Sequence, residues 1–189
     1  MIEGEGLLLR PPVSEDGERW LQSYSDPEEL RFGVPAGFPV PSTLADLDER
    51  AETARAAWAA RQPGSLVIAE ADAPDVWLGI VAWRHDLPPQ FRCADIGYVV
   101  HQDSRRRGIG GRALRTLVRW LTVDEDGPHH ARVQLDHSVE NIPSCRVALG
   151  AGLEIEGVRR SYLPLRDPDS PDGVRRHDVC LHGVVSTAG

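Results

Sequence analysis

The stretch Arg105-Arg106-Arg107-Gly108-Ile109-Gly110-Gly111-Arg112 decides how the rest of the chain is interpreted. A strand-like segment, residues 92–100, precedes it. Apolar residues follow it at helical spacing: Ile109, Ala113, Leu114, Leu117, Val118 and Leu121. The pattern predicts a strand, a short basic loop rich in glycine, and a helix. Such a junction directs main-chain N–H groups and the positive end of a helix dipole at one point, which is typical of a phosphate-binding site.

Two common nucleotide-binding motifs do not fit this loop. The P-loop requires a lysine, and all 21 basic residues of this chain are arginine. The dinucleotide motif G-x-G-x-x-G requires a third glycine where this chain has Ala113. A glycine-rich turn with solvated arginines is the plain alternative to a phosphate site, so the choice depends on the rest of the chain.

Composition places the chain among ordinary globular proteins. Its 189 residues are 41% hydrophobic and 26% charged, which predicts one domain with a sizeable core. The net charge of −8 argues against nucleic-acid binding, and the arginines between 105 and 119 therefore favour a small polyphosphate ligand. The start of the chain has no basic region followed by a long apolar run, so we expect no signal peptide, no membrane span and a cytoplasmic location.

Cysteines and histidines give no metal or disulfide signal at the level of spacing. The three cysteines are odd in number and far apart, and we expect free thiols: Cys93, Cys145 and Cys180. Four histidines lack the spacing of metal ligands and are expected on the surface or in strands: His129, His130, His177 and His182. The sequence thus predicts no metal site.

Hydrophobic periodicity predicts the order β-α-α-β-β-β-α-β-α-β-β, an α/β protein with one mixed sheet. The strands are expected at residues 7–10, 66–69, 76–83, 92–100, 131–136, 154–163 and 174–185. Helices are expected from Ser14 to near Asp26-Pro27, from the Ser42-Thr43 cap to the Pro63-Gly64 stop, after Gly108, and after Asn141. Residues 72–75 are expected to form a hairpin turn. The proline-rich apolar loop at residues 32–41 either lines a binding cleft or packs on the core.

Three motifs, in this order along the chain, resemble the GNAT superfamily of acetyl-CoA-dependent N-acetyltransferases. Arg105, Gly108 and Gly110 fit its motif [RQ]-x-x-G-x-[GA], and the segment ADIGYVV at residues 94–100 is similar to its fourth strand. Asn141-x-x-Ser144, with the glycines and glutamate of residues 152–157, resembles the RimJ/RimL-like branch. The match is strongest over residues 91–157. The resemblance implies a single GNAT domain over residues 1–189, with splayed central strands.

The resemblance also implies that acetyl-CoA is the co-substrate, held where the strands at residues 92–100 and 131–136 separate. Main-chain groups of Val99 and Val100 would pair with the pantetheine arm, and amides of residues 107–112 would hold the pyrophosphate. Asn141 would contact the pantetheine arm, although an asparagine here also suits a plain helix cap. The implied cofactor-binding residues are Tyr98, Val99, Val100, Arg105, Arg106, Arg107, Gly108, Ile109, Gly110, Gly111, Arg112, Asn141 and Ser144.

For catalysis, the resemblance implies Asp95 and Ser144. Asp95 stands where many family members carry a glutamate thought to act as base, and its shorter side chain makes a bridging water more necessary; an ordinary ion pair with an arginine is the alternative role. Ser144 would hydrogen-bond or protonate the leaving thiolate. A tyrosine acid found in many members is replaced by Ala148, and Tyr162 is another source of a hydroxyl.

The resulting hypothesis is transfer of an acetyl group from acetyl-CoA to a primary amine, either a protein N-terminus or a small molecule. The alternative is a catalytically silent GNAT fold that binds acyl-CoA as a sensor or partner module. A nucleic-acid-binding role is disfavoured by the net charge and by the lack of interleaved aromatics. We expect no membrane partner, and a homodimer remains one option.

Overall fold

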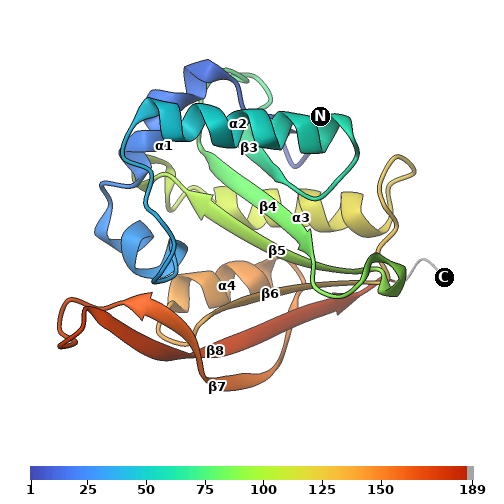
Figure 1. Cartoon of the computed structure of the whole chain (residues 1–189). Helices are drawn as coiled ribbons and strands as arrows, with labels where there is room; N and C mark the ends of the chain where they lie inside the picture. Colours follow the sequence, from blue (N-terminus) through green and yellow to red (C-terminus); the bar gives the residue numbers. More distant parts are fainter. Residues whose placement is uncertain (187–189) are drawn as a thin grey trace.

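The computed structural model describes residues 1–186, and one eight-stranded sheet lies at its centre (Figure 1). The strands are β1 (Ile2–Gly4), β2 (Leu7–Arg10), β3 (Ser65–Glu70), β4 (Gly79–His85), β5 (Cys93–Val100), β6 (Arg132–Ser138), β7 (Glu154–Arg166) and β8 (Val174–Val185). The α-helices are α1 (Gly17–Ser23), α2 (Leu44–Ala59), α3 (Ile109–Thr122) and α4 (Ile142–Gly150). Within the described chain, no helix is long and apolar enough to cross a membrane.

The strand order is β1-β2-β3-β4-β5-β6-β8-β7. Only β5 and β6 run parallel, and their pairing stops after three positions, the last of which joins Asp95 to Gln134. Beyond that pair the two strands separate. The sheet therefore has an open gap at its centre, as the expected splayed strands require.

Helices cover both faces of the sheet, which explains why its central strands are apolar on both sides. On β3, Leu66 and Ile68 belong to the core under α3, whereas Val67 belongs to a second cluster with Trp20 of α1 and Leu47 of α2. Figure 1 shows α1 and α2 on the near side of β4 and β5, and α3 behind them.

The expected order of elements is confirmed, including the Thr43 cap of α2, whose hydroxyl accepts the Asp46 N–H at 3.2 Å. Several details differ. The strand β1 was not predicted, and a π-helical turn at Glu29–Gly33 precedes the proline-rich loop. The second apolar strand begins at Gly79 rather than at residue 76, because Arg19 Nε donates to the Trp77 carbonyl at 2.6 Å and removes that carbonyl from the sheet.

The first helix also begins later than predicted. A 3₁₀ turn, Ser14–Asp16, comes first, and α1 starts at Gly17. The buried Asp16 carboxylate accepts hydrogen bonds from the Val13 N–H at 2.7 Å and from the Arg10 guanidinium at 2.7 and 2.8 Å. That fixed carboxylate holds the chain in a tight turn before the helix can begin.

Candidate active site

The edge of β5 that faces the gap presents main-chain groups of alternate residues. The Arg92 carbonyl accepts the Ala131 N–H on the β6 side, whereas the Cys93 carbonyl accepts the Asp86 N–H on the β4 side. Because these directions alternate along a strand, the main-chain groups of Tyr98 and Val100 face the gap.

This register corrects the expectation for Val99. The Val99 carbonyl points at Gly79 of β4, where a Cβ would collide with it. The Val99 main chain therefore faces β4 within the sheet and is not available to a ligand in the gap. The Val100 carbonyl does face the gap, although it accepts a hydrogen bond from Arg105 Nε at 3.2 Å.

The basic loop joins β5 to α3 and leaves a row of amides free. Gly108, with φ of 73°, caps α3 in the left-handed region that glycine adopts without strain. The first bond that closes the helix runs from the Arg112 N–H to the Gly108 carbonyl at 3.1 Å. Within residues 1–186, the main-chain N–H groups of residues 106–111 donate to no protein acceptor. This arrangement suits an anion.

Most arginine side chains of the loop are directed at carboxylates. Arg105 binds Asp26 and, at 2.9 Å, Glu28. Arg107 and Arg112 both contact Glu70, at 3.2 and 2.9 Å. Among the described residues Arg106 has no such partner, and its side chain is exposed. The expected role in holding phosphate therefore falls mainly on the main chain, with Arg106 as the one free guanidinium of the described loop.

Gly110 brings α3 close to the other predicted residues. A Cβ there would lie 3.0 Å from the Tyr98 ring and 3.3 Å from Val147 of α4. The Tyr98 hydroxyl donates to Ser144 Oγ at 3.4 Å, and burial raises the pKa of the phenol. Ser144 is buried. The structure thus brings β5, α3 and α4 together around a pair of hydroxyl groups.

Asn141 acts as the cap of α4. Its Oδ1 accepts the Ser144 N–H at 3.2 Å, so the capping role suggested as an alternative is present. The carboxamide N–H₂ donates to no acceptor in the described part of the chain, and it stays available to a ligand.

Asp95 lies where β5 and β6 make their last pair, and both roles considered for it are visible. It forms an ion pair with Arg84, which alone would lower its pKa. Burial outweighs that pairing and, with the nearby Asp136 and Asp86 carboxylates, raises the pKa of Asp95 to about 6. A buried carboxylate with such a pKa suits a general base near neutral pH.

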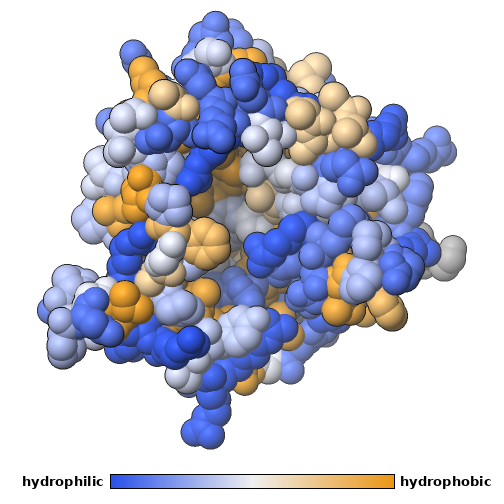
Figure 2. Space-filling model, viewed as in Figure 1, coloured by the Kyte–Doolittle hydropathy of each residue, from blue (hydrophilic) through white to orange (hydrophobic). Residues whose placement is uncertain are grey.

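A cleft of about 240 Å³ opens on the opposite face of β5 from Tyr98, and Figure 2 shows the hollow near the centre of that face. Its walls come from α1, from the turn and loop after it, and from the strands at Ile80 and Val99. Gly33, Val34, Pro35, Phe38 and Pro39 line it. The loop at residues 32–41 was expected either to line a cleft or to pack on the core, and the structure shows that it lines a cleft.

Glu29 is a cleft residue that sequence reasoning missed. Its side chain packs against Gly33 and is 8% exposed. Burial, opposed by the charge of Arg105, raises the pKa of its carboxyl to about 7. No described group donates a hydrogen bond to that carboxyl. One acidic residue before a proline-rich loop carries no sequence signal, because only the folding of the π turn buries it.

The face of β5 between this cleft and Asp95 carries no side chain at Gly97. Side chains of Asp95, Gly97 and Val99 share one face of β5, and a Cβ at Gly97 would meet nothing within 4 Å. Asp95 and Val99 are four residues apart, about 13 Å along the strand. A substrate in the cleft can therefore extend toward Asp95 over the glycine.

Neither the position of the missing tyrosine acid nor Tyr162 places a hydroxyl group beside Ser144. Ala148 is fully buried, and Tyr162 on β7 is 51% exposed with the Arg159 guanidinium 5.0 Å from its ring centre. Of the four histidines, His177 and His182 are strand residues as expected and lie buried, His129 is exposed, and His130 is buried outside the strands. No metal-ligand spacing was recognised in the sequence, but the fold brings His182 next to His137 and Cys180.

The class of protein follows from this fold and from a family comparison. The model of the Acetyltransferase (GNAT) domain matches residues 6–154. The chain therefore belongs to the GNAT acetyltransferases, and it is an N-acetyltransferase. No curated protein matches the chain in sequence.

Solved structures share the fold over nearly the whole chain. RimJ from Mycobacterium smegmatis, in complex with a CoA disulfide, is 22% identical with a TM-score of 0.77 over 95% of this chain and 81% of that one. Ribosomal-protein-S5-alanine acetyltransferase from Vibrio fischeri is 16% identical, with a TM-score of 0.79 over 98% and 96%. RimL, a ribosomal alpha-N-protein acetyltransferase in complex with coenzyme A, is 17% identical, with a TM-score of 0.74 over 98% and 97%.

Proposed function

We propose that this protein transfers the acetyl group of acetyl-CoA to a primary amine that enters through the Glu29 cleft. The observation that carries the proposal is the row of free amides at residues 106–111, set beside an open strand edge that ends at Asp95. Neighbours with bound coenzyme A support the choice of co-substrate.

In this proposal the pyrophosphate binds the amides of residues 106–111, and Arg106 meets a further phosphate. The pantetheine arm pairs with the main chain of Tyr98 and Val100 as an added strand would, and with the free Asn141 carboxamide. The thioester is then proposed to lie near the Tyr98–Ser144 pair, because Tyr98 belongs to the strand edge that the arm follows.

The acceptor amine is proposed to approach from the other face. A buried carboxyl without a hydrogen-bond donor, such as that of Glu29, is a favourable partner for an ammonium group because it is otherwise left unpaired. The aromatic and proline walls of the cleft would contact the apolar part of the acceptor. Both a peptide N-terminus and a small amine fit this chemistry.

The reaction requires proton removal from the acceptor, attack on the thioester and protonation of the leaving thiolate. Asp95 takes a proton from the acceptor ammonium through a bridging water, and the free amine attacks the thioester carbon. The C–S bond breaks as the amide forms. The departing thiolate receives a proton from Ser144, whose hydroxyl Tyr98 can resupply. The new amide nitrogen gives up its remaining extra proton, which returns through water to Tyr98, and Asp95 releases its own proton to solvent.

The test is an acetylation screen of N-terminal peptides and small amines, read as thiol release from acetyl-CoA and as the mass of the product. Wild-type protein should acetylate at least one acceptor, and acetyl-CoA should raise the melting temperature because it binds only the folded state. Binding without turnover on any acceptor would favour the silent acyl-CoA-binding fold. No change in melting temperature with millimolar acetyl-CoA would overturn the proposal.

Glu29→Gln separates acceptor binding from chemistry. The KM for the amine should rise while the affinity for acetyl-CoA stays unchanged, because the lost charge faces the acceptor alone. Glu18→Gln, at an exposed position of α1, is the matched control and should match wild type. Loss of turnover with an unchanged KM would instead make Glu29 the base.

A further inference from the structure

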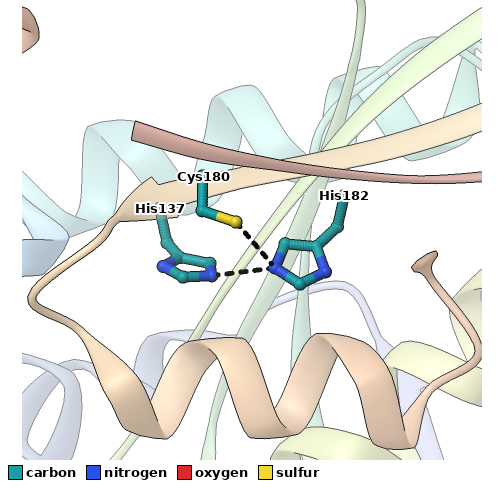
Figure 3. Close-up of side chains that lie close together, drawn as sticks. All are labelled: His137, Cys180 and His182. Carbon is teal, nitrogen blue, oxygen red and sulfur yellow. Dashed lines mark hydrogen bonds between the residues drawn. The ribbon is translucent and has the colours of Figure 1, made fainter. Parts of the chain in front are cut away.

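A second cluster of reactive side chains lies between β6 and β8, away from the acetyl-transfer residues. His137 of β6 is directly opposite Cys180 of β8, and His182 is opposite Leu135. Figure 3 shows the three labelled side chains pointing toward one another, with a helix running alongside. The exposed fractions are 6% for His137, 8% for Cys180 and 0% for His182.

Hydrogen bonds to the main chain settle which ring nitrogens carry protons. His137 Nδ1 lies 2.7 Å from the Ser138 carbonyl oxygen, and His182 Nδ1 lies 3.3 Å from the Leu153 carbonyl oxygen. A carbonyl oxygen only accepts, so both Nδ1 atoms carry the hydrogen. In the neutral rings, both Nε2 atoms are therefore lone-pair acceptors.

These two acceptors face each other. The distance between His137 Nε2 and His182 Nε2 is 3.1 Å, and Cys180 Sγ is 3.5 Å from His182 Nε2. Two neutral acceptors at that distance repel each other, and burial makes the mismatch costly. The Cys180 thiol can donate its hydrogen to His182 Nε2 but leaves His137 Nε2 without a donor. The contact between the two rings is therefore relieved by a proton on one ring or by a cation.

The two separations that involve His182 Nε2 match those around a tetrahedral zinc ion. With Zn–N bonds of about 2.0–2.1 Å and a Zn–S bond of about 2.3 Å, two nitrogen ligands lie about 3.3 Å apart, and a nitrogen and a sulfur about 3.5 Å apart. All three ligand atoms lie within 4.8 Å of one another. The Nδ1–H bonds to carbonyl oxygens are the outer contacts that orient metal-binding histidines.

We propose that His137, Cys180 and His182 bind a Zn²⁺ ion through Nε2, Sγ and Nε2. Binding releases the Cys180 thiol proton to solvent, and the thiolate and two neutral imidazoles become three of four ligands. The ion joins β6 and β8, and through the His182–Leu153 hydrogen bond it also holds the segment after α4, where the Leu153 N–H donates to the Ala148 carbonyl of that helix. Ser144 lies on that helix, so the site supports the acetyl-transfer residues without touching a substrate.

The experiment uses chelator-treated wild-type protein titrated with Co²⁺, whose visible and near-ultraviolet bands report tetrahedral, thiolate-bound geometry. We expect a thiolate-to-cobalt charge-transfer band that saturates at one ion per chain and disappears on addition of Zn²⁺. Zn²⁺ at about 100 times its Kd should raise the melting temperature by roughly 5–10 °C. Absence of both the band and the shift would overturn the proposal and leave a proton shared by the two histidines.

Variants locate the ion. Cys180→Ser should lose the charge-transfer band, and His137→Gln should weaken Zn²⁺ binding by more than the roughly 10–100-fold cost of losing an outer hydrogen bond. Should Cys180→Ser fail to fold, His137→Gln and His182→Gln answer the same question. Cys93→Ser and His129→Gln, outside the cluster, should bind as wild type does. Loss of the band in Cys93→Ser, or wild-type affinity in His137→Gln, would refute the site.

Discussion

At the scale of single residues, Asp95 and Glu29 owe their chemistry to burial. Each carboxyl loses hydration that no neighbouring cation fully replaces, so the neutral form gains and the pKa rises. Arg84 and Arg105 oppose the shift without cancelling it. Two carboxyl groups that titrate near neutral pH thus lie on the face of the sheet from which the acceptor is proposed to approach.

Asp95→Asn should lower kcat by about 10²–10⁴-fold, the usual contribution of a general base, and leave acetyl-CoA affinity nearly intact. The wild-type rate should rise as pH increases through about 6, since Asp95 must be ionised to accept a proton. With an acceptor amine of low pKa, which is already neutral in this range, the rate of Asp95→Asn should no longer rise with pH. Steady-state kinetics between pH 5 and 8 measures both effects.

Asp167→Asn, which removes a surface ion pair with Arg175, is the matched control and should leave turnover unchanged. Near-normal turnover of Asp95→Asn would show that the carboxylate only pairs with Arg84. Catalysis would then depend on positioning the amine against the thioester.

At the scale of elements, the start of α3 combines an anion site with tight packing. Gly110→Val should weaken acetyl-CoA binding by about tenfold or more, equivalent to about 1.4 kcal/mol, because its branched side chain displaces the Tyr98 ring. Gly111→Val should weaken binding much less, since its nearest neighbour is the flexible Arg115 side chain at 3.5 Å. Calorimetric titration with acetyl-CoA compares the two.

Both substitutions place valine in the first turn of the same helix, so differences in helix propensity cancel. Equal losses in the two variants would show that the glycines matter only for approach to the phosphate. The contact with Tyr98 would then have no part in binding.

Arg105 joins the loop before α3 to the segment that carries Glu29. It pairs with Asp26 and Glu28, and its charge lowers the pKa of Glu29. Arg105→Gln should therefore move the pH dependence of acceptor binding to higher pH, because Glu29 keeps its proton longer. The KM for the amine, measured across pH 6–9, reports the shift.

Arg119→Gln, which breaks an exposed pair with Asp124, is the control and should leave the profile in place. A profile that Arg105→Gln does not move would mean that another group controls acceptor binding.

At the scale of the whole molecule, Glu29 makes stability depend on pH. Its pKa is raised from 4.5 to about 7, so the folded state binds more protons than the unfolded state between these values, and stability falls as pH rises through that window. Each pKa unit corresponds to about 1.4 kcal/mol, so the ionised carboxylate lowers the free energy of unfolding by about 3 kcal/mol above pH 7.

At pH 8, Glu29→Gln should therefore raise the free energy of unfolding above that of wild type by up to about 3 kcal/mol. At pH 4 the two proteins should be almost equally stable. Urea unfolding at both pH values measures the difference. If Glu29→Gln stabilises the protein equally at pH 4 and pH 8, the effect comes from packing rather than from the charge.

The sequence by itself determined the order of elements and the glycine-rich junction before α3. Glycines at positions 108 and 110, an apolar strand before them and an amphipathic helix after them encode the junction locally, because turn geometry and helix capping depend on neighbouring residues. The segments around Asp95 and Ser144 are equally local, so the family resemblance is legible in the order of residues alone.

Only the tertiary structure decided what depends on contacts between distant segments. Burial of the Glu29 carboxyl, the partners of the loop arginines and the side of β5 that Val99 faces all follow from packing and register. His137 and Cys180 are far apart in the sequence and are neighbours because β6 pairs with β8. Periodicity predicts which residues are buried in a strand, but strand order and register determine which of them meet.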